Sequence, residues 1–576
     1  MASPPALMDD VDAVQAQIAR NMLQSGDWVT ARLDGVAYLE KSPLKYWTMA
    51  VSYRLFGVHD WSARIPIVLT CLLLCWLTAR FAAWAFGWRA GTAAGLALAT
   101  SVGLFLFTRV LIPDVMLTLA ITAALWALMR ALDAQERRPG AWALLMWAAM
   151  GTGMLLKGLV AVVLPLGAAA LYLGVTGSFN RKTLRRLRPF SGAALALAIA
   201  APWHVLATLH NPPYFDFTLH SEAGSYHGFF WFYFINEQLL RFLNLRYPRD
   251  YNTVPRLYFW LLHLLWLFPW SVYFPAAVKL SYRRPDRASR VRLLALCWCG
   301  VVLGFFTFST TQEYYSMPCY PALALLVGSA LAEGGERVRW GTRVVAAVAA
   351  AAAVVIAAIL WLVRGLPAPG DISVALTQNP EVYTLSLGHM TDLTLRAFAY
   401  LRTPLALAGV AFLVGAVGAW GAQRRGAGWS GRTVTIASLV VMMVLFFHAA
   451  RLALVVFDPY LSSRPLADAL NTAPPGKLIV DDQYYTFSSV FFYTNRTALL
   501  LNGRVNNLEY GSYAPDAPRG IFLTDRDLPR LWAGPERYYL VAEAPRLPEL
   551  RRLLGRPLIP VKAAGGKFLL TNSALK

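Results

Sequence analysis

Long apolar runs recur along most of the chain, and they constrain its fold more than any other feature. A helix that crosses a hydrocarbon layer of about 30 Å needs about 20 apolar residues, because it rises about 1.5 Å per residue. The runs lie at 65–86, 90–108, 114–132, 141–156, 158–176, 190–209, 257–280, 292–308, 315–332, 344–363, 404–421 and 433–457. Only 15% of the 576 residues are charged, whereas soluble domains have about 25%. We therefore expect an all-α polytopic membrane bundle of about twelve transmembrane helices.

The basic residues account for a net charge of +21, but they do not form the single patch typical of a nucleic-acid-binding protein. They gather in short loops between alternate pairs of predicted helices. These loops contain Arg137, Arg138, Arg181, Lys182, Arg185, Arg186, Arg188, Arg283, Arg284, Arg287, Arg290, Arg292, Arg337, Arg339, Arg343, Arg424, Arg425 and Arg432. Such loops stay in the cytoplasm under the positive-inside rule. The pattern predicts a bilayer protein that has no nucleic-acid partner.

The remaining loops are then predicted to lie outside the cytoplasm. The long ones are 1–63, 210–256 and 364–403, and the short ones are 109–113, the hairpin around Lys157, and 309–314. Residues 1–63 contain no hydrophobic segment that could carry them across, so we expect a further transmembrane helix upstream.

Composition changes abruptly after the last apolar run. Short β-rich runs such as 477–480, 498–501 and 538–541 alternate with helical patterns at 462–471 and 545–554. This alternation is typical of a small α/β unit. We therefore divide the chain into a transmembrane domain, residues 1–457, and a soluble outer α/β domain, residues 458–576.

Two short helices are predicted in the outer loops. Residues 12–24 have an amphipathic pattern, with Asp12 as the N-cap and Gln15 completing a capping box, which suggests a helix along the membrane surface. A second helix is expected from Trp231 to Leu243, in a loop rich in aromatic residues. The five cysteines lie in or at the ends of apolar helices, which favours helix packing over a disulfide or zinc framework.

Three groups of ionisable residues in the outer loops are candidates for chemistry, because charges near a bilayer are costly. The first group combines Asp9, Asp10 and Asp12 with Glu40 and Lys41. A carboxylate there can act as a general base or hold a divalent ion. An equally good interpretation is that Asp12 serves only as the cap of its helix, and that Asp9 and Asp10 are solvated.

The second group is Arg109 and Asp114, on either side of Pro113 in a short turn. Capping by Asp114 and an ion pair with Arg109 are equally consistent with this spacing.

The third group is Lys157, Glu237 and Arg241. Lys157 interrupts almost forty apolar residues, so it either reaches water at a hairpin or binds an anion such as a lipid phosphate. Glu237 and Arg241 are four residues apart on one helical face, where a surface pair is worth only a few tenths of a kcal/mol.

Several segments between residue 9 and about residue 330 occur in an order and spacing that carry a family resemblance. They are Ile18-Ala19-Arg20, Ser25–Thr30, Tyr38–Leu44, Leu55-Phe56-Gly57, Pro113-Asp114, Leu156-Lys157-Gly158, Ala201-Pro202-Trp203, and Glu237 to Phe242. Together they resemble the polyprenyl-phosphate-dependent integral membrane glycosyltransferases related to the aminoarabinose transferase of lipid A and the protein O-mannosyltransferases. The resemblance implies a GT-C-like bundle, usually of thirteen spans, which twelve spans here plus one upstream would match.

The resemblance also implies an activity and a set of site residues. A sugar would move from a polyprenyl (undecaprenyl) phosphate donor to a lipid, glycan or protein acceptor, at the outer (periplasmic) face of a bacterial inner membrane. Catalytic roles would fall on Asp10, Asp12, Glu40 and Asp114, and donor-phosphate binding on Lys41, Arg109, Lys157 and Arg241, with Glu237 as a further site residue. A divalent cation, Mg²⁺ or Mn²⁺, is possible at Asp10 and Asp12, and the sequence does not decide whether the reaction depends on it.

The chain departs from the family pattern at two places. The family's adjacent Asp-Glu aligns with Val11-Asp12, so the base is Asp10 by a one-residue shift, or Asp12 directly; we favour Asp10. The family's Glu-His pair is Glu237-Gln238 here, so a role for that histidine does not transfer.

A polytopic lipid or sugar transporter is the main alternative, because helices with intramembrane charges describe it too. The predicted spans show no inverted pair of Gly/Pro-broken helices, and their charges gather at the outer edge. The sequence therefore favours a glycosyltransferase.

Overall fold

The structure is a computed structural model that describes residues 4–249, 253–379, 387–424 and 428–574. Within these ranges, nine helical segments are long and apolar enough to cross a membrane. They are Asp60–Phe86 (α3), Asp114–Leu132 (α6), Pro139–Lys157 (α7), Pro189–His210 with the preceding Arg181–Leu187 (α10 and α9), Arg287–Phe308 (α14), Tyr320–Glu333 with the preceding Glu313–Cys319 (α15 and η3), Glu336–Val363 (α16), Arg402–Arg424 (α18) and Trp429–Leu461 (α19). The predicted all-α membrane bundle is confirmed.

The other three predicted spans are short or broken, so the number of about twelve is not confirmed. The run 90–108 divides into Trp88–Ala99 (α4) and Val102–Phe107 (α5), and the run 158–176 forms only the 16-residue helix Val160–Val175 (α8). The run 257–280 bends by 95° between Arg256–Trp266 (α12) and the segment Trp270–Ala277, which as one span would raise the described total to ten. Pro269, which has no N–H for a helical hydrogen bond, lies at this bend. Hydropathy predicts apolar length, but not whether a run stays straight.

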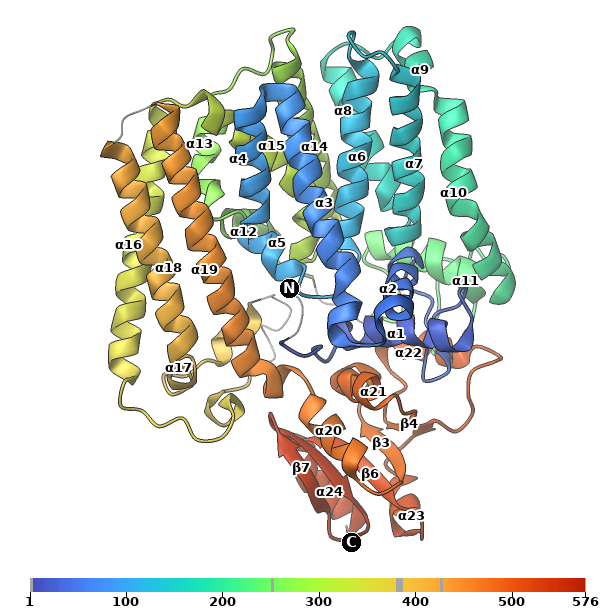
Figure 1. The fold of residues 1–576 in the computed structure, drawn as a ribbon. Helices are drawn as coiled ribbons and strands as arrows, with labels where there is room; N and C mark the ends of the chain where they lie inside the picture. Colours follow the sequence, from blue (N-terminus) through green and yellow to red (C-terminus); the bar gives the residue numbers. More distant parts are fainter. Residues whose placement is uncertain (1–3, 250–252, 380–386, 425–427, 575–576) are drawn as a thin grey trace.

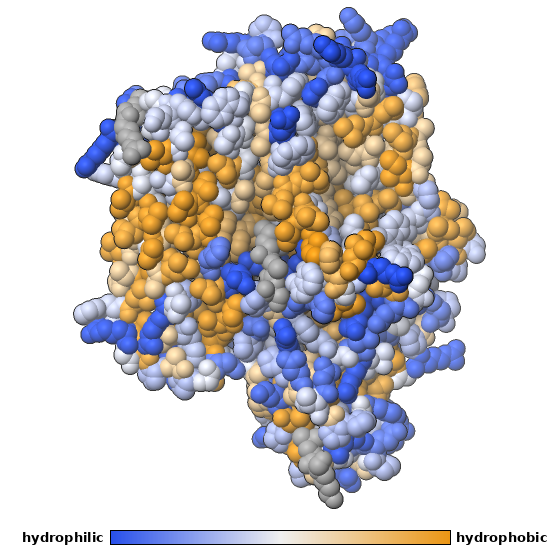
Figure 2. Space-filling view, in the orientation of Figure 1, coloured by the Kyte–Doolittle hydropathy of each residue, from blue (hydrophilic) through white to orange (hydrophobic). Residues whose placement is uncertain are grey.

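The two ends of the bundle differ in composition (Figure 1). The Arg-rich loops next to α9 lie at one end, whereas α1 (Val11–Ser25), α2 (Leu44–Phe56) and the C-terminal sheet lie at the other. A hydrophobic belt separates a strongly hydrophilic cap from the mixed surface of the opposite end (Figure 2). Helices α16, α18 and α19 pack on one another at the side of the main bundle (Figure 1).

The C-terminal unit contains a six-stranded sheet in the order β5-β4-β3-β6-β8-β7. The strands are Lys477–Asp481 (β3), Ala498–Leu501 (β4), Phe522–Leu523 (β5), Tyr538–Glu543 (β6), Ile559–Ala564 (β7) and Lys567–Thr571 (β8). The first four strands in this order run parallel to one another, whereas β8 pairs antiparallel with both β6 and β7. Strands β3 and β6 are apolar and buried, as expected for parallel strands covered on both faces. Helices α20 (Arg464–Thr472) and α24 (Leu547–Leu554) match the two predicted helical patterns.

Helix α1 differs from its predicted position on the membrane surface. Its residues from Asp12 to Ala19 are all buried, and it packs on α2 and on α21 (Ser488–Thr494) of the C-terminal unit. The predicted N-cap is also wrong, because the helix begins at Val11 and Asp10 precedes it without a capping hydrogen bond from its side chain. Amphipathic periodicity did not show that a distant part of the chain covers the polar face.

Candidate active site

A tight hairpin precedes the segment that contains Glu40 and positions it. Strands Arg32–Leu33 (β1) and Val36–Ala37 (β2) pair through the turn Asp34-Gly35, in which both residues have positive φ, 50° and 82°. An Asp-Gly pair is favoured in such turns because glycine adopts positive φ without strain. The C-terminal unit packs tightly on this hairpin, since a Cβ added to Gly511 would lie 1.9 Å from the carbonyl oxygen of Ala37.

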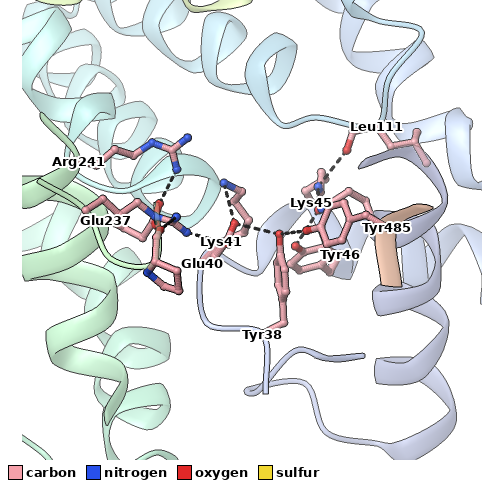
Figure 3. Close-up of polar contacts among 12 residues, drawn as sticks. Tyr38, Glu40, Lys41, Lys45, Tyr46, Leu111, Glu237, Arg241 and Tyr485 are labelled. Atoms are coloured by element: carbon pink, nitrogen blue, oxygen red, sulfur yellow. Dashed lines mark hydrogen bonds and ion pairs between the residues drawn. The ribbon is translucent and has the colours of Figure 1, made fainter. Parts of the chain in front are cut away.

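Glu40 lies at the centre of a polar cluster (Figure 3). Its buried carboxylate accepts a hydrogen bond from the Tyr38 hydroxyl at 3.0 Å, and it pairs with Lys41 at 3.4 Å and with Arg246 at 2.9 Å. The Tyr38 hydroxyl also lies 2.8 Å from that of Tyr485, a residue of the C-terminal unit. The carboxylate therefore holds a cation on each side.

Arg246 connects Glu40 to Glu237. Its fully buried side chain also pairs with Glu237, which in turn accepts a hydrogen bond from Arg241 at 2.8 Å. Burial acts to raise the pKa of Glu237, but Arg246, Arg241 and Lys41 more than offset it and hold that pKa below its ordinary value. Glu237 and Arg241 are therefore part of a buried network and not an isolated surface pair. Glu237 lies in the π-helix Trp231–Leu240 (η1), where the sequence predicted a helix, and Arg241 follows its last residue.

Three cations surround the phenol of Tyr315. Arg241 donates a hydrogen bond to its hydroxyl at 3.2 Å, and the Lys157 amine lies 4.3 Å from its ring centroid. Lys41 is also close enough to act on it electrostatically. The side chains of Lys41, Lys157 and Arg241 are 28%, 23% and 18% exposed, so part of each faces solvent. They form the site's cation cluster, Lys41–Lys157–Arg241.

Asp114 pairs with Lys157 and not with Arg109. Its buried carboxylate lies 2.6 Å from the Lys157 amine. The Arg109 guanidinium instead lies 4.7 Å from the ring centroid of Phe105, close to Arg64 and Arg451. The Arg109–Asp114 ion pair, which the sequence allowed, is thus wrong.

The three N-terminal aspartates have different surroundings. Asp9 accepts hydrogen bonds from the Ser489 N–H at 2.8 Å and from the Lys567 amine at 2.6 Å. Asp12 is 1% exposed, and its oxygens accept from the N–H groups of Met8 and Leu111 and from Arg64.

Asp10 is exposed, and its carboxylate has no hydrogen bond in the part of the chain that the structure describes. Its backbone is fixed, because its N–H donates to the Tyr485 carbonyl at 2.8 Å and its carbonyl accepts from Ser488 at 3.1 Å. Desolvation by the surrounding protein, together with the charge of Asp9, raises the pKa of Asp10 to about 6. A carboxylate with this pKa, and without a competing partner, can accept a proton near neutral pH.

Lys45 is a buried cation that the sequence analysis did not select. Its amine donates to the side chain of Gln15 and, at 3.0 Å, to the Leu111 carbonyl (Figure 3). Burial, and then the charge of Lys41, lower the pKa of Lys45 well below its ordinary value. This lysine joins α1, α2 and the 109–113 turn, so its contacts explain its burial.

The sequence analysis also did not select Arg246, Tyr315 and Tyr485. Arg246 lies among several arginines in its loop, Tyr315 is part of an apolar run, and Tyr485 belongs to the separate C-terminal unit. None has a regular spacing from the other site residues, so no periodic signal marked them.

Asp10 and Asp12 do not fit a divalent metal ion. The Asp12 oxygens are already occupied by N–H donors, one of them cationic. Among the described residues, no group of three or more His, Cys, Asp or Glu side chains is placed to hold a metal. No step of the chemistry below is therefore assigned to Mg²⁺ or Mn²⁺.

A bundle of apolar helices with a charged site at one end and a small α/β unit beside it defines a polytopic membrane protein. The ArnT of Cupriavidus metallidurans, solved bound to undecaprenyl phosphate, has this fold, with a TM-score of 0.77 and 24% identity over 99% of this chain and 94% of that chain. Residues 40–205 match the family model described as dolichyl-phosphate-mannose-protein mannosyltransferase.

Curated relatives support the same resemblance. The undecaprenyl phosphate-alpha-4-amino-4-deoxy-L-arabinose arabinosyl transferase of Pectobacterium carotovorum is 30% identical over 54% of this chain and 53% of its own length. The protein of the same name from Erwinia tasmaniensis is 26% identical over 92% of this chain and 88% of its own length. The matched region thus spans about half the length of the first relative and most of the second. The resemblance to polyprenyl-phosphate-dependent membrane glycosyltransferases is confirmed.

Proposed function

We propose that this protein transfers a sugar from a polyprenyl phosphate donor to a hydroxyl group of a membrane-associated acceptor. The observation that carries the proposal is the cluster Lys41–Lys157–Arg241 around Tyr315, at one end of a membrane bundle. Three partly exposed cations at this boundary match a lipid phosphate, whose negative charge increases as the bond to the sugar breaks. The names of the relatives support this donor class.

Asp10 is the proposed general base. It removes the proton of the acceptor hydroxyl while that oxygen bonds to the sugar carbon and the phosphate oxygen leaves. Its accessible carboxylate supports this role, whereas Asp12 is fully engaged with Arg64 and backbone N–H groups. The leaving phosphate needs no proton when cations neutralise it.

Glu40, Asp114 and Glu237 are proposed as positioning residues. Each is buried and bonded to at least one cation of the cluster. Because a buried carboxylate fixes the direction of its partner, these pairs hold the ammonium and guanidinium groups toward one phosphate.

The proposed reaction can be tested with purified protein in detergent and radiolabelled polyprenyl-phosphate sugars, including the aminoarabinose donor named in the relatives. We expect sugar transfer to a lipid acceptor and release of polyprenyl phosphate, both lost in Asp10→Asn. A transporter would move the intact donor between leaflets of a vesicle without breaking the sugar–phosphate bond. Intact donor after prolonged incubation with every sugar tested would contradict the proposal.

The site is further proposed to face the periplasm, with the domain 458–576 on the same side. Support comes from the Arg-rich loops at the opposite end of the bundle. In a variant without the native cysteines, Ser25→Cys should react with a membrane-impermeant maleimide in intact spheroplasts. Asn180→Cys, beside the Arg-rich helix α9, should react only after lysis. The reverse pattern would contradict this orientation.

A further inference from the structure

Arg109 carries a buried guanidinium whose hydrogen-bonding capacity is largely unused. The residue is 6% exposed, and its Nε and one terminal nitrogen have no partner in the described part of the chain. Unpartnered donors of a buried cation are costly, because water has been removed from them without replacement. Such a group indicates a missing acceptor.

The nearest charged groups increase this cost. Arg64 and Arg451 both act electrostatically on Arg109, and the buried Nε of Arg64 also has no partner in the described ranges. Burial, followed by these two arginines, lowers the pKa of Arg109 to about 10, so its guanidinium stays protonated at neutral pH. Three cations thus lie together with at least three unused N–H donors. We call them the arginine cluster, Arg64–Arg109–Arg451.

The carboxylates around this cluster are already engaged elsewhere. Asp12 is 3.3 Å from Arg64 but also accepts from the N–H groups of Met8 and Leu111. Asp458, which also acts on Arg64, accepts from the N–H of Ala6 at 3.0 Å. The remaining contacts of Arg64 and Arg451 are with backbone carbonyls of residues 4–6. No carboxylate is bound to Arg109 among the described residues.

Aromatic rings adjoin the cluster at Arg109. The ring of Phe105 lies 4.7 Å below the Arg109 guanidinium and stacks on Phe447 of α19 at 4.2 Å. Both rings are half-buried, and they belong to helices α5 and α19. On this face, hydrophilic side chains interrupt the hydrophobic belt near the N-terminal end of the chain (Figure 2). The site therefore offers cations and apolar surface together, as an anionic amphiphile requires.

We propose that the cluster Arg64–Arg109–Arg451 binds the phosphate headgroup of a membrane lipid, separately from the cluster Lys41–Lys157–Arg241. A phosphate monoester supplies several acceptor oxygens and up to two negative charges, which match the unused donors. A bound phosphate offsets the positive charge that Arg64 and Arg451 bring to Arg109.

The test counts lipids bound to the full-length protein by native mass spectrometry. The probe is dioctanoyl phosphatidic acid, with dioctanoylglycerol and inorganic phosphate as separate arms. We expect the wild type to bind two molecules of the acid, one at each cluster. Arg109→Gln and Lys157→Gln should each bind one, and the double variant none above the level seen with dioctanoylglycerol. Arg364→Gln, which removes an exposed arginine outside both clusters, should bind two.

Stability separates a binding role from a structural one. Arg109→Gln should leave the melting temperature of the lipid-free protein unchanged or raise it, because an unpaired buried charge is removed. It should lose the stabilisation that phosphatidic acid gives, and Arg109→Lys should recover part of it.

The inference is overturned if Arg109→Gln binds as many lipids as the wild type, or if it unfolds while Arg109→Lys restores stability without phosphatidic acid. An equal effect of inorganic phosphate at the same concentration would overturn the assignment to a lipid. Failure of the sugar-transfer assay, with loss of one lipid in Arg109→Gln, would contradict the proposed reaction and leave this site in place.

Discussion

The side-chain amine of Lys567 lies 2.6 Å from the carboxylate of Asp9 and so joins the last strand of the C-terminal sheet to the residue before the proposed base. The same unit binds Asp9 through Ser463 and the N–H of Ser489, and it holds the backbone of Asp10 through Tyr485 and Ser488. The C-terminal unit is thus part of the structure that positions Asp10.

Lys567→Met should impair transfer by changing the surroundings of Asp10. Without Lys567, the charge of Asp9 is no longer balanced, and Asp9 already raises the pKa of Asp10. We expect kcat to fall and the acidic limb of the kcat profile to move to higher pH, because a like charge opposes ionisation. Lys562→Met, at an exposed lysine on β7, should keep the wild-type profile. Lower activity in Lys567→Met with an unmoved pH profile would contradict the electrostatic role.

The pH dependence of the wild type follows from Asp10 itself. A general base must be ionised, so a group with a pKa of about 6 loses activity as pH falls through that value. We expect transfer to rise between about pH 5 and pH 7, and Asp10→Asn to lower kcat by about 10²–10⁴-fold at pH 7.5. Asp10→Asn should not lower the melting temperature at this pH, because the carboxylate has no hydrogen bond to lose among the described residues and its raised pKa disfavours the ionised form. Activity in Asp10→Asn within twofold of the wild type would exclude this base.

Much of the fold could be predicted, because membrane helices are specified by local apolar length. The positive-inside pattern placed Glu40, Lys157 and Glu237 in outer loops, and the structure brings their neighbourhoods together at one end of the bundle. The features that the sequence did not predict depend on contacts between residues that are 52 to 447 positions apart. Asp12 has the local pattern of an N-cap, but its partners include Arg64 and Leu111. Similarly, nothing near residue 485 indicated a hydroxyl bonded to Tyr38.

The contacts of Asp12 predict that it stabilises the structure. Asp12→Ala removes the acceptor of two backbone N–H groups and leaves Arg64 with less compensation, so we expect a loss of about 3–5 kcal/mol, typical of a broken buried ion pair. Thermal unfolding in detergent should show a clear fall in melting temperature. Asp9→Asn, which keeps hydrogen-bonding capacity at a neighbouring position, should cause a smaller fall. A stable but inactive Asp12→Ala would instead indicate that Asp12 is the base.

Arg246 should be important for structure, because two buried carboxylates share its guanidinium. Arg246→Met leaves two buried carboxylates, Glu40 and Glu237, without their shared partner. We expect a large loss of stability, and partial recovery when Glu237→Gln is added, because one of the two carboxylates that lost Arg246 is then neutral. Melting temperatures of Arg246→Met, Glu237→Gln and the double variant measure the loss and the recovery. If Glu237→Gln lowered the melting temperature of Arg246→Met further, the network would not be held by charge pairing.

The Asp114 carboxylate and the Lys157 amine lie 2.6 Å apart. A double-mutant cycle can separate the roles of these two residues. Lys157→Gln removes a proposed phosphate ligand, so the KM for the donor should rise about 10–100-fold, the range expected for a charge-assisted hydrogen bond. Asp114→Asn keeps the Lys157 amine but removes the charge that orients it, so this variant should raise KM less than Lys157→Gln does. Because Asp114 is proposed to act through Lys157, the double variant should be no worse than Lys157→Gln alone. Lys182→Gln, in the Arg-rich helix α9 at the opposite end of the bundle, should leave KM unchanged. If the two effects were additive in free energy, Asp114 would have a role of its own and would contact the substrates directly.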